Sequence, residues 1–197
     1  RLLDSAAGTP AWPPSHISLH DGDPGTTGAN ELTGGSPAYG RQAAAWDAAS
    51  GGSRALTGTE QFNVPATKTV RWIGYWSAAT AGTYFGASPA GSAARRAFCV
   101  DDISADTLES PAHGLVNNDQ AVVFAANGAA LPTGLAEGTI YHVVSATTDD
   151  LQLSATSGGA AINLTAIGDG DIQKITPEVF AAQGTYTVSA LTLSLPG

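Results

Sequence analysis

The sequence contains a single cysteine, Cys99, and only 13% of its residues are charged. One cysteine excludes an intramolecular disulfide and a cysteine-rich zinc site. The formal net charge is −9, from 17 acidic and 8 basic residues. This balance argues against binding to a phosphate backbone, which requires clustered Lys and Arg, and the only adjacent basic pair is Arg95–Arg96. We therefore expect no nucleic-acid partner and no cysteine chemistry.

Long apolar runs and helical patterns are also missing. No stretch of 18 apolar residues occurs in the 197-residue chain, so we expect no membrane-spanning helix and no membrane partner. Residues 2–7 are the one short helix candidate, because Gly8 and Pro10 follow them. Apolar residues nevertheless make up 43% of the chain, together with 24 Gly and 11 Pro. This composition predicts an all-β fold with many turns and a buried core.

The clearest strand pattern covers residues 69–78. Its bulky side chains alternate between two faces, with Trp72 and Trp76 on one and Ile73 and Tyr75 on the other. Because both faces are bulky, we expect this strand to be central and covered on both sides. Residues 41–49 are ambiguous between helix and strand. The remaining predicted strands are 16–20, 82–88, 121–126, 139–146, 151–155, 161–167 and 184–197, the last with a bend near Ser189–Ala190.

The segment "DGDPG" at 21–25 begins like a calcium-binding loop. Asp21, Asp23 and Glu31 are its weak candidate ligands. The pattern fails, because Pro24 and Gly25 replace the next oxygen ligand and Leu32 occupies the twelfth position. Asp-Gly and Pro-Gly pairs supply the backbone angles that tight turns require. We therefore favour a string of turns and predict neither a metal nor a cofactor.

No catalytic arrangement stands out elsewhere. His16 and His20 lie about 13 Å apart if they share a strand, too far for an obvious common ligand. His113 and His142 are expected to be satisfied structural histidines. The sequence has no G-x-S-x-G nucleophile elbow and no phosphate-binding loop. We expect no enzymatic activity.

Aromatic residues provide an alternative function, which is stacking on carbohydrate. Trp12, Trp46, Trp76 and Tyr39 are the candidates for contact with a glycan or with another subunit. Aromatic side chains more often belong to the core, and we favour that interpretation. The solvent exposure of the tryptophans distinguishes glycan contact from a place in the core.

Residues 19–41 resemble a known family through the pattern L-H-x-x-D-P-G-x-x-G-x-N-E, followed by Tyr39 and Arg41. The segments "FNVPATKTVRWIGYWSAATAGTYFG" and "GTYTVSALTLSL" extend this resemblance. The family consists of small structural proteins of tailed bacteriophages, common in phages of actinobacteria and usually called tail fibre or minor tail proteins. The resemblance implies a non-enzymatic virion component.

A second resemblance covers residues 107–172. "HGL", "LPTGLAEGTIYHV" and "LQLS" are similar to a β-module of many phage tail and fibre proteins, with Asn118–Asp119 where that module usually has Gly-Asp. Shorter members of the first family, as the resemblance has it, lack this module. We therefore predict a discontinuous β-sandwich-like antiparallel domain, residues 1–97 plus 177–197, with a small β-domain inserted at 98–176 near its C-terminal strand.

Together these observations predict a structural protein on the exterior of a phage virion. A tail fibre or minor tail subunit and a head decoration protein remain equal alternatives, and a carbohydrate-binding host-adhesion module is the alternative from another class. The expected partners are other capsid or tail proteins. By analogy with fibres, we also expect a homo-oligomer, specifically a trimer.

Overall fold

The computed structural model describes residues 13–91, 93–126 and 130–194. The chain divides into two compact units, the first of residues 1–92 and 177–197 and the second of residues 93–176. All sheets in both units are antiparallel, and one 3₁₀ turn, Ile103–Ala105, is the only helical element among the described residues. The all-β prediction is confirmed. The predicted helix at 2–7 lies outside the described residues.

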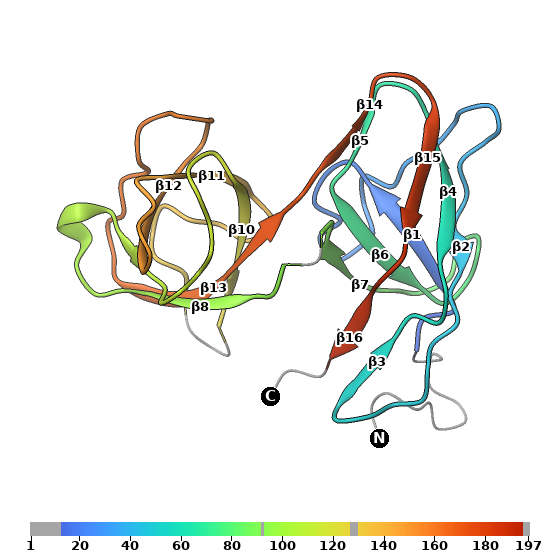
Figure 1. The fold of residues 1–197 in the computed structure, drawn as a ribbon, viewed down its shortest axis with the longest axis horizontal. Coiled ribbons are helices and arrows are strands. Elements are labelled where there is room, and N and C mark those ends of the chain that lie inside the picture. Colours follow the sequence, from blue (N-terminus) through green and yellow to red (C-terminus); the bar gives the residue numbers. More distant parts are fainter. Residues whose placement is uncertain (1–12, 92, 127–129, 195–197) are drawn as a thin grey trace. The chain divides into compact units, whose positions relative to one another are not determined.

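The first unit contains a four-stranded sheet whose strands follow the order β2-β1-β6-β7 (Figure 1). The two inner strands pair with each other from His16 opposite Trp76 to His20 opposite Trp72. All five residues of β6 are buried, so this strand is central and covered on both faces, as its sequence pattern predicts. The strands are β1 (His16–His20), β2 (Gln42–Ala43), β6 (Trp72–Trp76) and β7 (Tyr84–Pro89).

Three short strand pairs complete the first unit by joining the C-terminal segment to the middle of its N-terminal part (Figure 1). The last 21 residues of the chain, 177–197, supply one strand of each pair. A break between Val188 and Thr192 lies where the bend was expected. The pairs are β3 (Ser53–Ala55) with β16 (Thr192–Ser194), β4 (Glu60–Val64) with β15 (Gly184–Val188), and β5 (Lys68–Val70) with β14 (Glu178–Phe180).

One hydrophobic core lies on one face of the four-stranded sheet. Ile17 of β1 and Ile73 of β6 pack there with Phe62 of β4. The C-terminal segment contributes Phe180 and Val188, and both are buried in the same core. The first unit therefore needs both ends of the chain to bury its apolar side chains.

The second unit is a closed barrel with the strand order β10-β11-β12-β9-β8-β13 (Figure 1). Its interior is filled by its own apolar core, which includes Phe98, Val123 and Leu153. The strands are β8 (Arg96–Val100), β9 (Leu108–Glu109), β10 (Gln120–Ala125), β11 (Ile140–Val144), β12 (Asp150–Ser154) and β13 (Gly168–Ile175).

Two details of the second unit differ from the sequence-based expectation. The predicted strand at 161–167 is wrong, because only an isolated bridge between Ser154 and Ala161 forms there; the Leu164 amide donates to Asp106 Oδ1 at 2.7 Å instead of to a strand. The unit also begins at Ala93 and not at residue 98, because Arg96 and Ala97 already pair with β13. Whether this unit is an inserted, separately folding domain stays a prediction.

Candidate functional site

The family-like segment forms a loop that leaves β1 at Asp21 and returns beside the same strand. The Asp21 amide donates to the Asn30 carbonyl at 3.1 Å, and the Leu32 amide donates to the Leu19 carbonyl at 2.9 Å. Inside the loop, Asn30 Nδ2 donates to the Asp23 carbonyl at 2.7 Å. Residues 21–31, which we call the roof loop, are therefore tied to the end of β1 and braced internally.

His20 attaches the roof loop to the sheet. Its Nδ1 lies 2.6 Å from the Ala29 carbonyl oxygen, and its Nε2 lies 2.7 Å from Ser18 Oγ. Trp76 Nε1 donates to the same Ser18 oxygen at 2.8 Å. Ser18 and His20 are both fully buried. The group that binds the other ring nitrogen of His20 is the Ala29 carbonyl, whereas a catalytic triad would have a carboxylate there. The Ser–His pair is thus closed to a substrate and serves as an internal tie.

Close packing of the roof loop on the sheet depends on Gly28. A Cβ at this position would lie 2.6 Å from Trp76 Cη2 and 3.0 Å from Tyr84 Cδ2, and the glycine has a φ of +77°. Only a residue without a side chain fits both constraints. The roof loop therefore covers the face of β6 opposite the apolar core.

Glu31 and Arg41 form the second attachment of this region. Their side chains pair in a two-pronged manner, with Nε to Oε1 at 2.9 Å and one terminal nitrogen to Oε2 at 2.7 Å. The other terminal nitrogen donates to the Ala81 carbonyl at 2.7 Å. The guanidinium carbon also lies 3.4 Å from the centre of the Trp76 ring. Arg41 therefore locks the segment onto Trp76, and the fork geometry suits arginine and not lysine.

Tyr39 is a structural member of the same region. Its hydroxyl accepts from the Leu19 amide at 2.8 Å, and its ring is stacked on Phe62 with 6.1 Å between centroids. Burial raises the pKa of this phenol. Tyr39 therefore joins the loop to the core, and its ring is partly buried there.

The weak metal candidates do not come together. Asp21 Oδ2 pairs with Lys68 Nζ at 2.7 Å, and Asp23 Oδ1 accepts from the Gly25 amide at 3.1 Å. The Glu31 carboxylate forms an ion pair with Arg41. In the described parts of the chain, no grouping of three or more metal-type side chains includes any of these three carboxylates, and the absence of a metal stays a prediction.

The aromatic candidates are likewise engaged within the fold. Trp76 is 7% exposed, with Arg41 over its ring. Trp46 is partly buried and donates through Nε1 to the Pro14 carbonyl at 2.6 Å. Trp12 lies outside the described residues. Across residues 13–91, 93–126 and 130–194, the large apolar side chains that are exposed are aliphatic and not aromatic: Ile103, Val116, Ile167 and Val179.

In the second unit, the structure brings together residues that the sequence keeps apart. Cys99 Sγ and carboxylate oxygens of Asp101 and Glu109 all lie within 4.8 Å of one another. Cys99 is opposite Asp169 in β13 and opposite Glu109 in β9. Burial, then Asp101, Glu109 and Asp169, raise the pKa of the thiol. We missed this grouping, because only the barrel register places the strands side by side.

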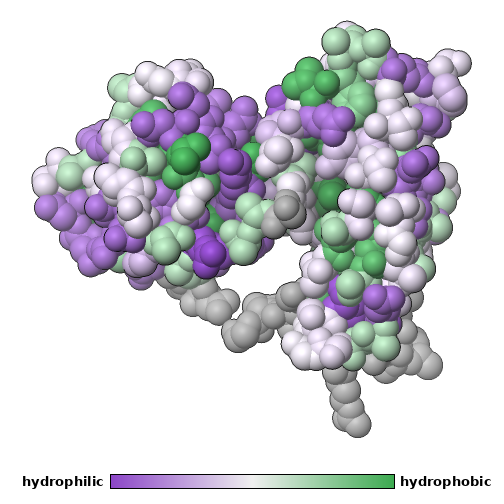
Figure 2. Space-filling model, viewed as in Figure 1, coloured by the Kyte–Doolittle hydropathy of each residue, from purple (hydrophilic) through white to green (hydrophobic). Residues whose placement is uncertain are grey.

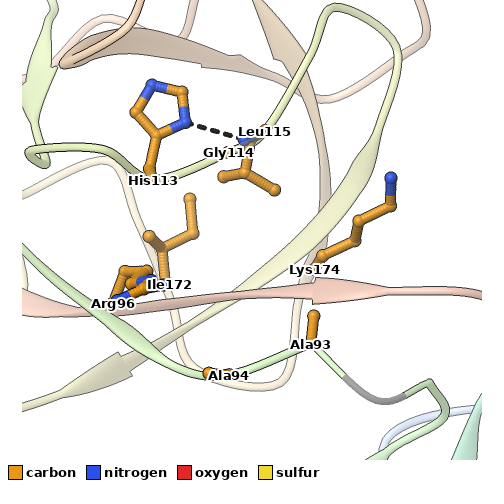
Figure 3. Close-up of a pocket in the computed structure, with 8 residues that line it drawn as sticks. All are labelled: Ala93, Ala94, Arg96, His113, Gly114, Leu115, Ile172 and Lys174. Carbon is orange, nitrogen blue, oxygen red and sulfur yellow. Dashed lines mark hydrogen bonds between the residues drawn. The ribbon is translucent and has the colours of Figure 1, made fainter.

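A small depression of about 110 Å³ lies in the second unit, between residues 93–96, the loop at His113 and β13 (Figure 3). His113 Nδ1 accepts from the Leu115 amide at 2.9 Å, and Lys174 pairs with Asp119 at 2.6 Å. The depression is smaller than the roughly 300 Å³ at which ligand pockets usually begin. Its side chains show no nucleophile with an adjacent base.

The prediction that His113 and His142 are satisfied by hydrogen bonds is wrong for one ring nitrogen of each. His113 Nε2 and His142 Nδ1 are buried without a hydrogen-bond partner in the part of the chain that the structure describes. Both residues lie in the second unit, His113 in a loop and His142 on β11.

The described residues include no helix that is long and apolar enough to cross a membrane. Neither the curated proteins nor the solved structures contain a match to this chain. A family model described as "Podophage GP4 fiber I protein gp80" matches residues 1–95. This range contains the roof loop, Arg41 and β6, which carry most of the first sequence resemblance, whereas "GTYTVSALTLSL" lies outside it. The likeness to phages of actinobacteria stays a prediction, whereas the match shows that residues 1–95 are similar to a family of phage tail fibre proteins and supports the resemblance to such proteins.

Proposed function

We propose that the protein is a non-enzymatic structural subunit of a tail fibre on the exterior of a tailed phage virion. The observation that carries this proposal is the family match over residues 1–95, combined with what the matched residues do. His20, Glu31, Tyr39 and Arg41 all bind other parts of their own unit. The family pattern therefore specifies a rigid body and not a reactive centre.

The surface supports a role in contact with neighbouring virion proteins. The face of the first unit seen in Figure 2 is mostly white and pale green, so weakly polar side chains predominate on it. With 8 basic residues in the chain, few ion pairs can form between subunits, and exposed ion pairs contribute about 0–1 kcal/mol each. Assembly would then rest on apolar and backbone contacts, in a homo-oligomer that we propose to be a trimer by analogy.

The carbohydrate-binding alternative has less support. A stacking platform needs an accessible aromatic face, whereas Trp76 is buried and Trp46 and Tyr39 are partly buried in their own unit. The same observation does not separate a tail fibre from a head decoration protein, and both would be structural.

Labelling of intact particles with a gold-conjugated antibody against this protein tests the proposal. We expect label at the tail of intact virions. Label on the capsid surface would favour head decoration, and label that appears only after disruption of the particle would overturn an exterior location. Sedimentation velocity of the purified protein tests the trimer, and raising the salt to about 1 M, where the Debye length is about 3 Å, should not release the protein from the particle.

A further inference from the structure

The second unit is acidic, yet two of its few basic residues lie at one depression. Residues 93–176 contain ten acidic residues and three basic ones, Arg95, Arg96 and Lys174. Arg96 is the first residue of β8, and Lys174 is the last residue but one of β13. Both line the depression of about 110 Å³ described above. In a unit with a large excess of carboxylates, two cations at one depression favour an anionic ligand there.

The strand register places these two side chains at one mouth of the barrel. Arg96 lies opposite Ile172, and Lys174 lies opposite Ala121. Residues opposite each other in an antiparallel pair have side chains on the same face, and Ile172 and Ala121 both belong to the barrel core. Arg96 and Lys174 therefore lie on the inner side of the barrel wall, where β8 begins and β13 ends. In Figure 3 the side chains of Ile172 and Lys174 rise from β13 on the side of the loop that carries His113.

The two cations differ in how they are held. Lys174 Nζ pairs with Asp119 Oδ1 at 2.6 Å, and Asp119 Oδ2 accepts from the Val116 amide at 3.0 Å. An ammonium group has three donors, so this pair fixes Lys174, whose side chain is 37% exposed, and leaves further donors for a ligand. Arg96 is exposed, and within the described part of the chain its guanidinium makes no hydrogen bond or ion pair. Its donors are therefore available to a ligand.

The size and charge of the mouth select the class of anion. Together with Asp119, the two cations leave a single positive charge, which matches a monovalent anion better than a divalent phosphate. A water molecule takes up about 30 Å³ in the liquid, so a depression of about 110 Å³ has room for an end group and not for a whole drug-sized ligand. The planar fork of an arginine matches a carboxylate. His113 forms part of the wall, because its Nδ1 already accepts from the Leu115 amide.

We propose that this mouth binds the carboxylate of a small organic acid, either free or as the end group of a sugar acid. Arg96 holds the carboxylate through its fork, and Lys174 adds a second positive charge. The remainder of the ligand lies outside the depression. The site belongs to residues 93–176, whereas the family match ends at residue 95, so it does not depend on the structural role proposed above.

Titration of the full chain at constant ionic strength, followed through its amide resonances, tests this site. The probes are sodium acetate, sodium glucuronate and, as the neutral reference, glucose. We expect saturable shifts of the Gly114, Leu115 and Lys174 amides with both carboxylates and none with glucose. Tighter binding of glucuronate than of acetate would identify a sugar acid as the ligand, and equal binding would identify the carboxylate alone. The absence of a saturable shift with either carboxylate, or an equal shift with glucose, overturns the proposal.

The two neighbouring arginines supply a matched pair of variants. Arg96→Gln should weaken carboxylate binding about tenfold or more, because it removes a charged hydrogen-bond donor. Arg95→Gln removes the same charge one residue away, where Arg95 lies over the Phe124 ring, and should change the affinity less than about twofold. Equal losses in the two variants would mean general attraction by positive charge and would refute the site. Tighter binding of inorganic phosphate than of acetate would refute the assignment to a monocarboxylate. If Arg96→Gln does not fold, the comparison of acetate with glucose in the unchanged protein decides.

Discussion

Gly28 lies directly against the indole of Trp76, and this contact is where the roof loop meets the sheet. We predict that Gly28→Ala destabilises the first unit by two separate costs. The left-handed backbone costs about 1–2 kcal/mol for a residue with a side chain, and the overlap with Trp76 adds about 1–3 kcal/mol of overpacking. Urea unfolding followed by tryptophan fluorescence measures the sum.

Gly25→Ala is the matched control for this prediction. Gly25 also has a positive φ, +55°, but a Cβ there would meet nothing within 4 Å. Its substitution should therefore show the backbone cost alone. Equal effects of the two substitutions would mean that the contact between Gly28 and Trp76 contributes nothing.

The sequence predicts the turns of the roof loop but not its partners. Asp-Gly and Pro-Gly pairs identify tight turns from local chemistry, and the alternation in 69–78 identifies β6. The contacts of Trp76 with Gly28, Ser18 and Arg41 depend on the register between β1 and β6, which no local pattern encodes. The aromatic residues therefore looked like candidates for glycan contact until that register was known.

Arg41→Lys should weaken the first unit more than a change at the other acidic–basic pair of the roof loop. The Arg41 and Glu31 side chains are 10% and 19% exposed, whereas those of Lys68 and Asp21 are 35% and 29% exposed. Lysine cannot reproduce the fork to Glu31 and the bond to Ala81 together. We expect a loss of about 1–3 kcal/mol, against less than about 1 kcal/mol for Lys68→Gln.

A double-mutant cycle with Glu31→Gln checks the origin of this effect. If the pair is responsible, the loss from Arg41→Lys should shrink once Glu31 is neutral. Additive losses would instead assign the role of Arg41 to its contacts with Trp76 and with the Ala81 carbonyl.

The Cys99 thiol should react slowly with iodoacetamide at pH 7.5. Its pKa is raised by burial and by three nearby carboxylates, and the thiolate is the reactive form. Asp169→Asn combined with Glu109→Gln should accelerate alkylation, because both residues lie opposite Cys99 in the barrel. The rate in urea gives the reference for an unperturbed thiol. An unchanged rate in the double variant would leave burial and Asp101 as the causes of the raised pKa.

β13 shows why part of the barrel could not be predicted. Its first four residues are Gly168, Asp169, Gly170 and Asp171, and Gly and Asp are depleted in strands. The barrel nevertheless requires a glycine, since a Cβ at Gly170 would lie 2.7 Å from both the Phe124 carbonyl oxygen and the Phe98 ring. The close approach of β13 to β10 and β8 thus outweighs the low strand propensity of glycine, and this approach is visible only in the folded structure.

Calcium at about 1 mM should leave the thermal unfolding midpoint unchanged. Asp21, Asp23 and Glu31 each bind a different group of the protein, and a ligand that does not bind the folded state cannot stabilise it. Differential scanning calorimetry with calcium and with EDTA gives the comparison. A calcium-dependent rise in the midpoint that Asp23→Asn removes would contradict this prediction.

The last prediction concerns the two places where the chain passes between its units, at residues 92–93 and 176–177. The closing strand β15 pairs with β4 from Gly184 opposite Val64 to Val188 opposite Glu60, so residues 177–197 belong to the sheet pairs of the first unit. Gln183 adds a further tie, since its amide accepts from the Ser36 amide at 2.8 Å and donates to the Pro37 carbonyl at 2.9 Å. We therefore expect that a Gly-Ser linker can replace residues 93–176 and leave a folded first unit.

Truncation after residue 92 should have the opposite effect. It removes Phe180, Val188 and Leu193 from the core, and each such side chain contributes about 1.5–3 kcal/mol when fully buried. It also leaves β3, β4 and β5 without partners. The sum approaches the 5–15 kcal/mol of a typical domain, so the truncated chain should not fold, whereas the linker variant should unfold cooperatively on heating. Circular dichroism of both variants decides: a folded truncation would mean that the first unit does not need the C-terminal segment, and an unfolded linker variant would mean that the first unit depends on the second.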